Sequence, residues 1–171
     1  MLLFRMTAFL MLALPIHAFS QSVVSASETA KPGFERTAKM HATGTFQVSV
    51  KPAEASEIGK AAGLGRMTID KVWSGGIEGT SKGEMTTSAV GSAMAYVALE
   101  TMNVKIDGKS GTFVFSHKAT MDSTDPKTGV MDIAVLPNTG TGELKGIEGS
   151  LQITIDKSGH SYDFTYTLPA K

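Results

Sequence analysis

The sequence contains no cysteine, which excludes a disulfide framework, a zinc–thiolate site and thiol catalysis. It also lacks an excess of charge of either sign, with 16 Lys+Arg against 16 Asp+Glu and no long run of one kind. Such a balance provides no electrostatic attraction for nucleic acid or for an anionic membrane surface. Stability must therefore come from a packed core, and we expect no nucleic-acid partner.

Long hydrophobic runs are also absent, except for one at the start of the chain. A basic residue, Arg5, precedes an apolar run from Met6 to about Phe19, and small residues around Ser20 suggest a cleavage site. This pattern predicts a signal peptide over 1–20, with export to the periplasm or secretion and no stable membrane insertion after cleavage. An anchor helix is the alternative, although the run is short for a membrane span.

The segment 21–38 is rich in Ser, Ala, Thr and charge without a sustained period, and we interpret it as a flexible leader. A single domain is then expected over 39–171. Without residues 1–20 the chain keeps 15 Lys+Arg and 16 Asp+Glu, a formal net charge of −1.

From Met40 onward apolar and polar residues alternate, as in half-buried strands. Turn signals such as Asp107-Gly108 and Asp125-Pro126-Lys127 separate about eight such segments, three of them less regular, at about 76–88, 93–106 and 130–137. Only Ala53–Ala62 and about Gly142–Ile147 could be helical. We therefore predict an all-β fold, an eight-stranded closed antiparallel meander barrel with one or two short helices. A two-sheet β-sandwich is the alternative.

Several blocks occur in an order that resembles a known family: HATGTFQV, GRMTIDKVWSGGIEGTSKGEM, AYVALE, GTFVFSHKATM, GTGELKGIEGSL and GHSYDFTYTL. They resemble an uncharacterised bacterial domain-of-unknown-function family, over about Met40 to Leu168. The resemblance implies a barrel like that of allene oxide cyclase. It transfers no catalytic residue, because the family has no established activity. Cyclases with this type of barrel can assemble, so the resemblance also allows a homo-oligomer.

In the stretch TFVFSHKATM, alternation places His117 on the same face as two phenylalanines. If that apolar face points inward, the interior is lined by Phe46, Val48, Met67, Ile69, Trp73, Phe113, Phe115, Met121, Ile153, Ile155, Tyr162, Phe164 and Tyr166. Lys71 shares this parity and needs a partner if it is buried. Glu100 could supply it from the face of Tyr96. Glu84 could do so only if a glycine bulge near Gly79 or Gly83 turned it inward.

His117 has two interpretations. It is either a neutral core histidine with a hydrogen-bond partner, or part of a site that orients a ligand or moves a proton. The candidate ligand-binding residues are His117, Lys71, Glu100, Glu84, Tyr96, Trp73, Phe113, Phe115, Tyr162 and Tyr166. No spacing of the histidines points to a metal, and no cofactor motif survives inspection, so we expect neither.

The preferred hypothesis is binding of a small apolar or amphipathic molecule inside the barrel. A cofactor-independent isomerase or cyclase that uses His117 and a carboxylate is the first alternative. A packed barrel that acts through its surface is the second. A void around His117 would favour the first two hypotheses, and a filled interior would favour the third.

Overall fold

A computed structural model describes residues 38–170. The predicted signal peptide and nearly all of the predicted leader lie outside this range, so both stay predictions. The elements, in chain order, are β1 (Met40–Ala53), α1 (Glu57–Ala61), β2 (Leu64–Gly75), β3 (Ile77–Val90), β4 (Ala93–Ile106), β5 (Lys109–Asp122), β6 (Asp125–Val135), the 3-10 turn η1 (Gly142–Leu144), β7 (Glu148–Asp156) and β8 (Gly159–Thr167).

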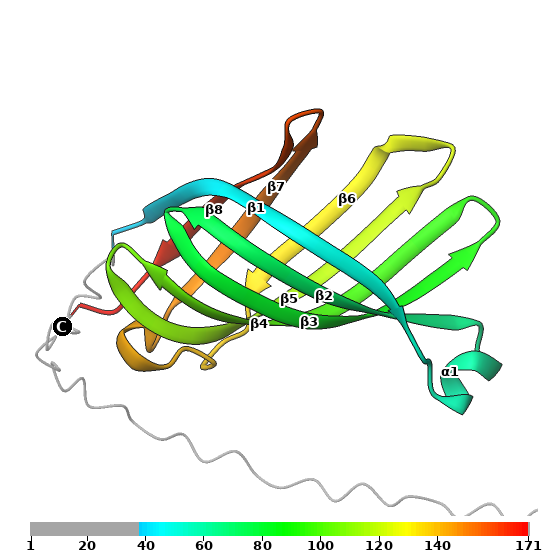
Figure 1. The fold of residues 1–171 in the computed structure, drawn as a ribbon, viewed down its shortest axis with the longest axis horizontal. Coiled ribbons are helices and arrows are strands. Elements are labelled where there is room, and N and C mark those ends of the chain that lie inside the picture. Colours follow the sequence, from blue (N-terminus) through cyan, green and yellow to red (C-terminus); the bar gives the residue numbers. More distant parts are fainter. Residues whose placement is uncertain (1–37, 171) are drawn as a thin grey trace, which may run out of the picture. The chain divides into compact units, whose positions relative to one another are not determined.

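The eight strands form a closed barrel in which every strand pairs antiparallel with its sequence neighbours, and β8 closes onto β1 (Figure 1). This confirms the predicted closed meander and excludes the sandwich. We can start at Val50 in β1 and move from each residue to its partner on the next strand. This path around the barrel returns to β1 at Met40, ten residues before Val50. A stagger of this size in an eight-stranded barrel leaves an interior that side chains fill, or that holds one small ligand.

Local sequence explains the turns and the short helices. Asp107 and Gly108 both have positive φ, 48° and 80°, as a two-residue hairpin turn requires. Ser56 caps α1 by accepting a hydrogen bond from the backbone N–H of Gly59. Asp125 and Lys127, which we had expected in a turn, belong to β6, because the β5–β6 turn comes two residues earlier.

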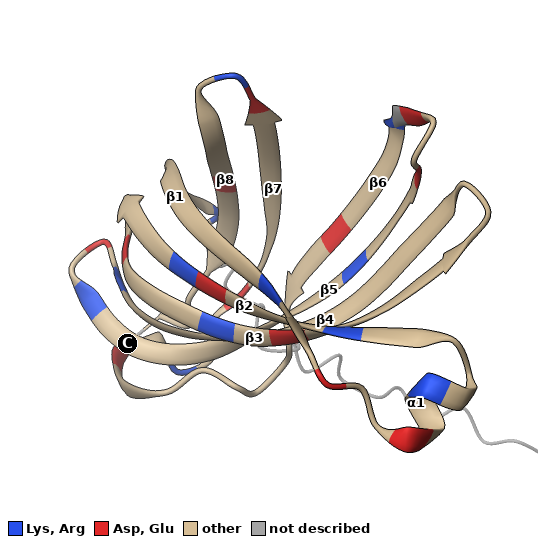
Figure 2. Ribbon diagram, turned by 45° about the vertical axis from the view of Figure 1, so that its right-hand side comes forward, with Lys and Arg blue, Asp and Glu red and all other residues tan. Residues whose placement is uncertain are grey.

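The two ends of the barrel differ. The closed end carries the β2–β3 and β4–β5 turns and η1, and its side chains form the larger apolar cluster, which includes Ile77, Ile106 and Leu144. The open end carries α1 and the β3–β4, β5–β6 and β7–β8 turns. Here the β5–β6 and β7–β8 hairpins diverge (Figures 1 and 2). Only one pair, Ala134 with Ser150, joins β6 to β7. We call this divergence the seam.

The open end exposes apolar residues whose parity points inward. Met121 is 41% exposed and Ile155 is 63% exposed, although the alternation of apolar residues predicted both as lining a shielded interior. Val50 and Met94 follow the same pattern. Their parity along the strands matches that of the buried residues, but all four lie near the open end of the barrel, where solvent reaches them.

Candidate functional site

Three of the predicted polar residues meet inside the barrel. Lys71 on β2, Glu100 on β4 and His117 on β5 all point inward and are buried, and Glu100 has no exposed surface at all. Ser81 of β3 is buried beside them. We call Lys71, Ser81, Glu100 and His117 the polar centre.

Glu100 is the hub of the polar centre. Lys71 Nζ donates to Glu100 Oε2 at 2.8 Å, and the Ser81 hydroxyl donates to Oε1. The Trp73 indole N–H donates in turn to Ser81 Oγ at 2.8 Å. A buried carboxylate is costly unless several donors surround it, and these contacts meet that requirement.

Aromatic rings shield the Lys71 ammonium on another side. Its Nζ lies 4.8 Å from the centroid of the Phe46 ring and 5.1 Å from that of Trp73. The faces of aromatic rings attract cations, which compensates part of the hydration that the ammonium loses on burial. Lys71 therefore has both a counter-charge and a cation–π environment.

The ionisation of Glu100 reflects this setting. Burial by itself would raise the pKa of its carboxyl, but the His117 ring, the charge and N–H of Lys71 and the Ser81 hydroxyl outweigh burial and lower the pKa to about 2. Glu100 is thus a stable carboxylate at neutral pH. Such a group is a weak base, so it is better suited to holding its neighbours than to removing protons.

His117 is not fully partnered. Its Nε2 lies 2.9 Å from Glu100 Oε2, which is hydrogen-bond distance, yet the direction of the ring N–H does not meet that oxygen. Among residues 38–170, Nε2 finds no aligned hydrogen-bond partner. The attraction to Glu100 is therefore electrostatic, and the buried N–H keeps capacity for a better aligned acceptor.

The predicted aromatic residues do lie inside the barrel, but most of them pack in the core of the closed end. Phe113 and Phe115 meet edge to face at 5.0 Å, and Phe164 stacks on Tyr166 at 5.1 Å. The Tyr166 hydroxyl donates to the Asp107 carboxylate, and burial together with that carboxylate raises the pKa of Tyr166. These residues fill the barrel below the polar centre.

The other two predicted tyrosines differ in position. The Tyr162 hydroxyl accepts from the backbone N–H of Ile77 at 2.7 Å, so it closes the β2–β3 turn and does not face the polar centre. Tyr96 is half-buried on the open-end side. Burial, and then the charge of Glu100, raise the pKa of the Tyr96 hydroxyl. Tyr96 therefore lies within the electrostatic reach of the polar centre.

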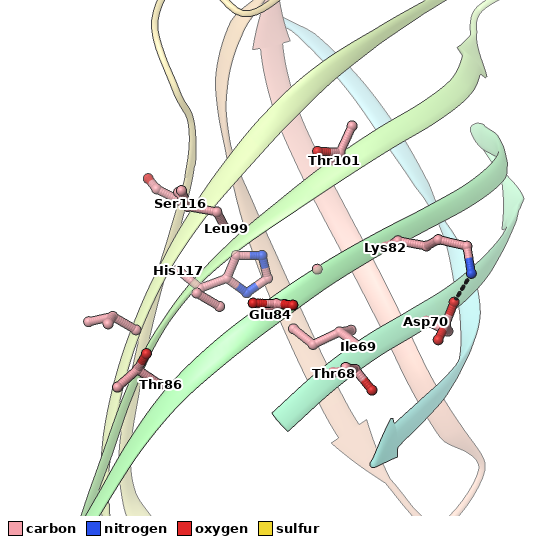
Figure 3. Close-up of a pocket in the computed structure, with 13 residues that line it drawn as sticks. Thr68, Ile69, Asp70, Lys82, Glu84, Thr86, Leu99, Thr101, Ser116 and His117 are labelled. Atoms are coloured by element: carbon pink, nitrogen blue, oxygen red, sulfur yellow. Dashed lines mark hydrogen bonds and ion pairs between the residues drawn. The ribbon is translucent and has the colours of Figure 1, made fainter. Parts of the chain in front are cut away.

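Glu84 lies on the outer face, contrary to the expectation that it points inward. The register of β3 with both neighbouring strands runs without a bulge, so nothing reverses its direction. It forms an exposed ion pair with Arg66. It also borders an open groove of about 960 Å³ across β2–β5 (Figure 3), where Asp70 pairs with Lys82. Val97 and Leu99 are the exposed apolar residues of that groove.

Sequence reasoning missed Ser81 and the contact between Phe46 and Lys71. Ser81 shares the inward parity of Ile77 and Met85, and this would have placed it inside. The signal is weak because Gly79 and Gly83 occupy the other inward positions of that strand.

Within the part of the chain that the structure describes, no group of three His, Asp or Glu side chains has an arrangement that could hold a metal ion. No helix within residues 38–170 combines the length and apolar character needed to cross a membrane.

Comparisons with known proteins agree with the fold. Residues 42–166 match the model of a family described as "Protein of unknown function (DUF3224)". A crystal structure of a DUF3224-family protein of unknown function from Shewanella oneidensis MR-1 is 35% identical, with a TM-score of 0.67. The match covers 78% of this chain and 100% of that one. No curated protein matches. By both family model and solved structure, this chain belongs to the DUF3224 family.

Proposed function

We propose that this barrel binds a small amphipathic molecule in its open half, with the polar group of that molecule at the polar centre. The observation that carries the proposal is the combination of exposed, inward-facing apolar residues above a buried charged cluster. Soluble domains seldom expose apolar side chains toward their own interior unless something covers them. Met121 and Ile155 are the clearest cases.

The donors and acceptors that remain free in the polar centre indicate the chemistry of the ligand's polar group. The Glu100 carboxylate already receives Lys71 and Ser81 and attracts His117, so a ligand meets few free acceptors there. The misaligned N–H of His117 is a spare donor. A ligand group with an accepting oxygen, such as a hydroxyl, carbonyl or carboxylate, would complement it.

The methionines of the open end suit such a ligand. Met94 and Met121 are direct cross-strand partners, and both are partly exposed. Unbranched thioether side chains adapt to irregular apolar shapes. We therefore expect tolerance toward the shape of the apolar part.

Binding can be tested with the fluorescent apolar probe N-phenyl-1-naphthylamine and its displacement by decanol. We expect saturable binding that weakens at least tenfold in Met121→Glu, because a carboxylate would enter the apolar wall. Thr120→Glu is the matched control, since Thr120 is the adjacent residue on the same strand and points outward. Equal binding by both variants, or no saturable binding by the unmodified protein, would overturn the proposal.

A second candidate function is a cofactor-independent isomerase or cyclase, favoured by the 2.9 Å approach of His117 Nε2 to Glu100. Because the low pKa of Glu100 makes it a weak base, proton transfer would belong to His117. Native mass spectrometry of protein purified from its own host would identify a copurifying molecule. Fresh protein in D₂O should then introduce deuterium into that molecule, and His117→Ala should not.

The third candidate, action through the surface, is favoured by the outer groove with Val97 and Leu99. We also propose that the protein acts in the periplasm or outside the cell, as the apolar run before Ser20 suggests. N-terminal sequencing of the protein from its host tests this. A mature terminus close to Gln21 is expected, and an intact Met1 would contradict it.

A further inference from the structure

The seam between β6 and β7 bears on the shape of the ligand. Because only Ala134 and Ser150 pair, the facing edges of β6 and β7 separate toward the open end (Figure 2). Extending the register of that pair would place Met131 opposite Ile153 and Gly129 opposite Ile155. The strands diverge instead, so these inward positions lie on strand edges that do not pair with each other.

Two other directions from the polar centre are blocked. Toward the closed end, Phe113, Phe115 and Phe164 pack against one another and are almost completely buried. Toward β2–β4, Ile69, Met85 and Ala98 form a second buried cluster. A ligand whose polar group reaches His117 cannot place its remaining atoms in either direction.

The seam side is both apolar and accessible. Met131 and Ile153 are half-buried and pack against the main core, and beyond them Met121 and Ile155 are exposed. Outward-facing charges stay on the other face, where Asp132 pairs with Lys118 at 3.8 Å. Apolar side chains therefore line the two strand edges from the half-buried Met131 and Ile153 to the exposed Ile155.

We propose that the ligand is a single-chain amphiphile, with its oxygen-bearing head at His117 and its apolar tail leaving the barrel through the seam. This inference rests on the proposed function and adds the ligand class and the route of the tail. A compact ligand would leave Ile155 uncovered, whereas a tail in the seam covers Met131, Ile153 and Ile155 in turn. Since Ile155 at the outer end of the seam is largely exposed, the tail need not end inside the barrel, and a range of tail lengths fits.

The test compares octanol, decanol and dodecanol as competitors of the fluorescent probe. Each buried methylene is worth about fourfold in affinity, so affinity should rise along the series for the unmodified protein. Ile155→Asp should flatten that rise while leaving octanol binding nearly unchanged, because the shorter tail does not reach the outer seam. Thr154→Asp is the control, with a new carboxylate on the outward face of the same strand.

The outcomes separate the two proposals. If the probe and all three alcohols fail to bind, the proposed function fails, and this inference fails with it. If the alcohols bind with equal affinity, or if Ile155→Asp and Thr154→Asp change the chain-length dependence equally, the seam route is wrong while binding in the barrel stands. Ile155 is largely exposed, so its replacement by Asp should not prevent folding.

Discussion

Lys71 and Glu100 are 29 residues apart in sequence, and their charged groups lie 2.8 Å apart inside the barrel. Lys71 is 6% exposed and Glu100 is fully buried. Removing one partner of such a pair leaves an uncompensated charge in a poorly hydrated place. The pair therefore makes the fold sensitive to changes at either residue.

Glu100→Gln should destabilise the protein by about 3–5 kcal/mol, because it leaves the Lys71 ammonium buried without a counter-charge. Chemical denaturation at neutral pH measures this. Glu84→Gln is the matched control: it makes the same chemical change in an exposed pair with Arg66 and should cost less than about 1 kcal/mol. Similar losses in the two variants would contradict the assignment of Glu100 as the hub.

The stability should fall in acid because of Glu100. Its pKa is lowered to about 2 in the folded protein, so the ionised carboxylate contributes stability above the pKa of the unfolded chain. This contribution, about 3 kcal/mol at neutral pH by linkage, should be lost as the pH falls from about 5 to about 2. Urea unfolding at several pH values measures it. The stability difference from Glu100→Gln should shrink over the same interval, and a constant difference would contradict the lowered pKa.

Gly83→Ala should destabilise the barrel by about 1–3 kcal/mol. A Cβ at this position would lie 2.5 Å from the backbone oxygen of Leu99 and 2.9 Å from Glu100 Cα, so β3 or β4 must shift beside the polar centre. Gly65→Ala is the control, because its Cβ would meet only the side chain of Thr87, which can rotate away. The melting temperatures of the two variants can be compared by thermal unfolding. Equal melting temperatures would contradict the close approach of β3 to β4.

Strand periodicity was sufficient to predict the inside of this barrel at several positions. Lys71 and His117 each sit within strands whose apolar residues alternate, so their direction followed from their neighbours. Glu100 followed from the parity of Ala98 and Met102, once that face was taken as the interior. The mutual contacts of these residues required the closed topology, which brings β2, β3, β4 and β5 side by side.

The errors have identifiable causes. Glu84 was placed inside because glycines nearby suggested a bulge, whereas Gly83 allows β3 to approach β4 closely without one. Ile155 lies beyond the point where β6 stops pairing with β7, and Met121 lies where the register between β5 and β6 shifts. Both points are set by long-range strand register, which alternation within one strand cannot reveal.

The most direct measurement is a nuclear magnetic resonance titration of protein with ¹³C-labelled methionine methyl groups, using decanol as the ligand. The account predicts shifts at Met121, Met94 and Met131, together with the His117 ring, and none at Met102, which is fully buried beside the closed-end core. Shifts confined to residues of the outer groove such as Val97 and Leu99, observed by amide signals in the same titration, would contradict binding inside the barrel.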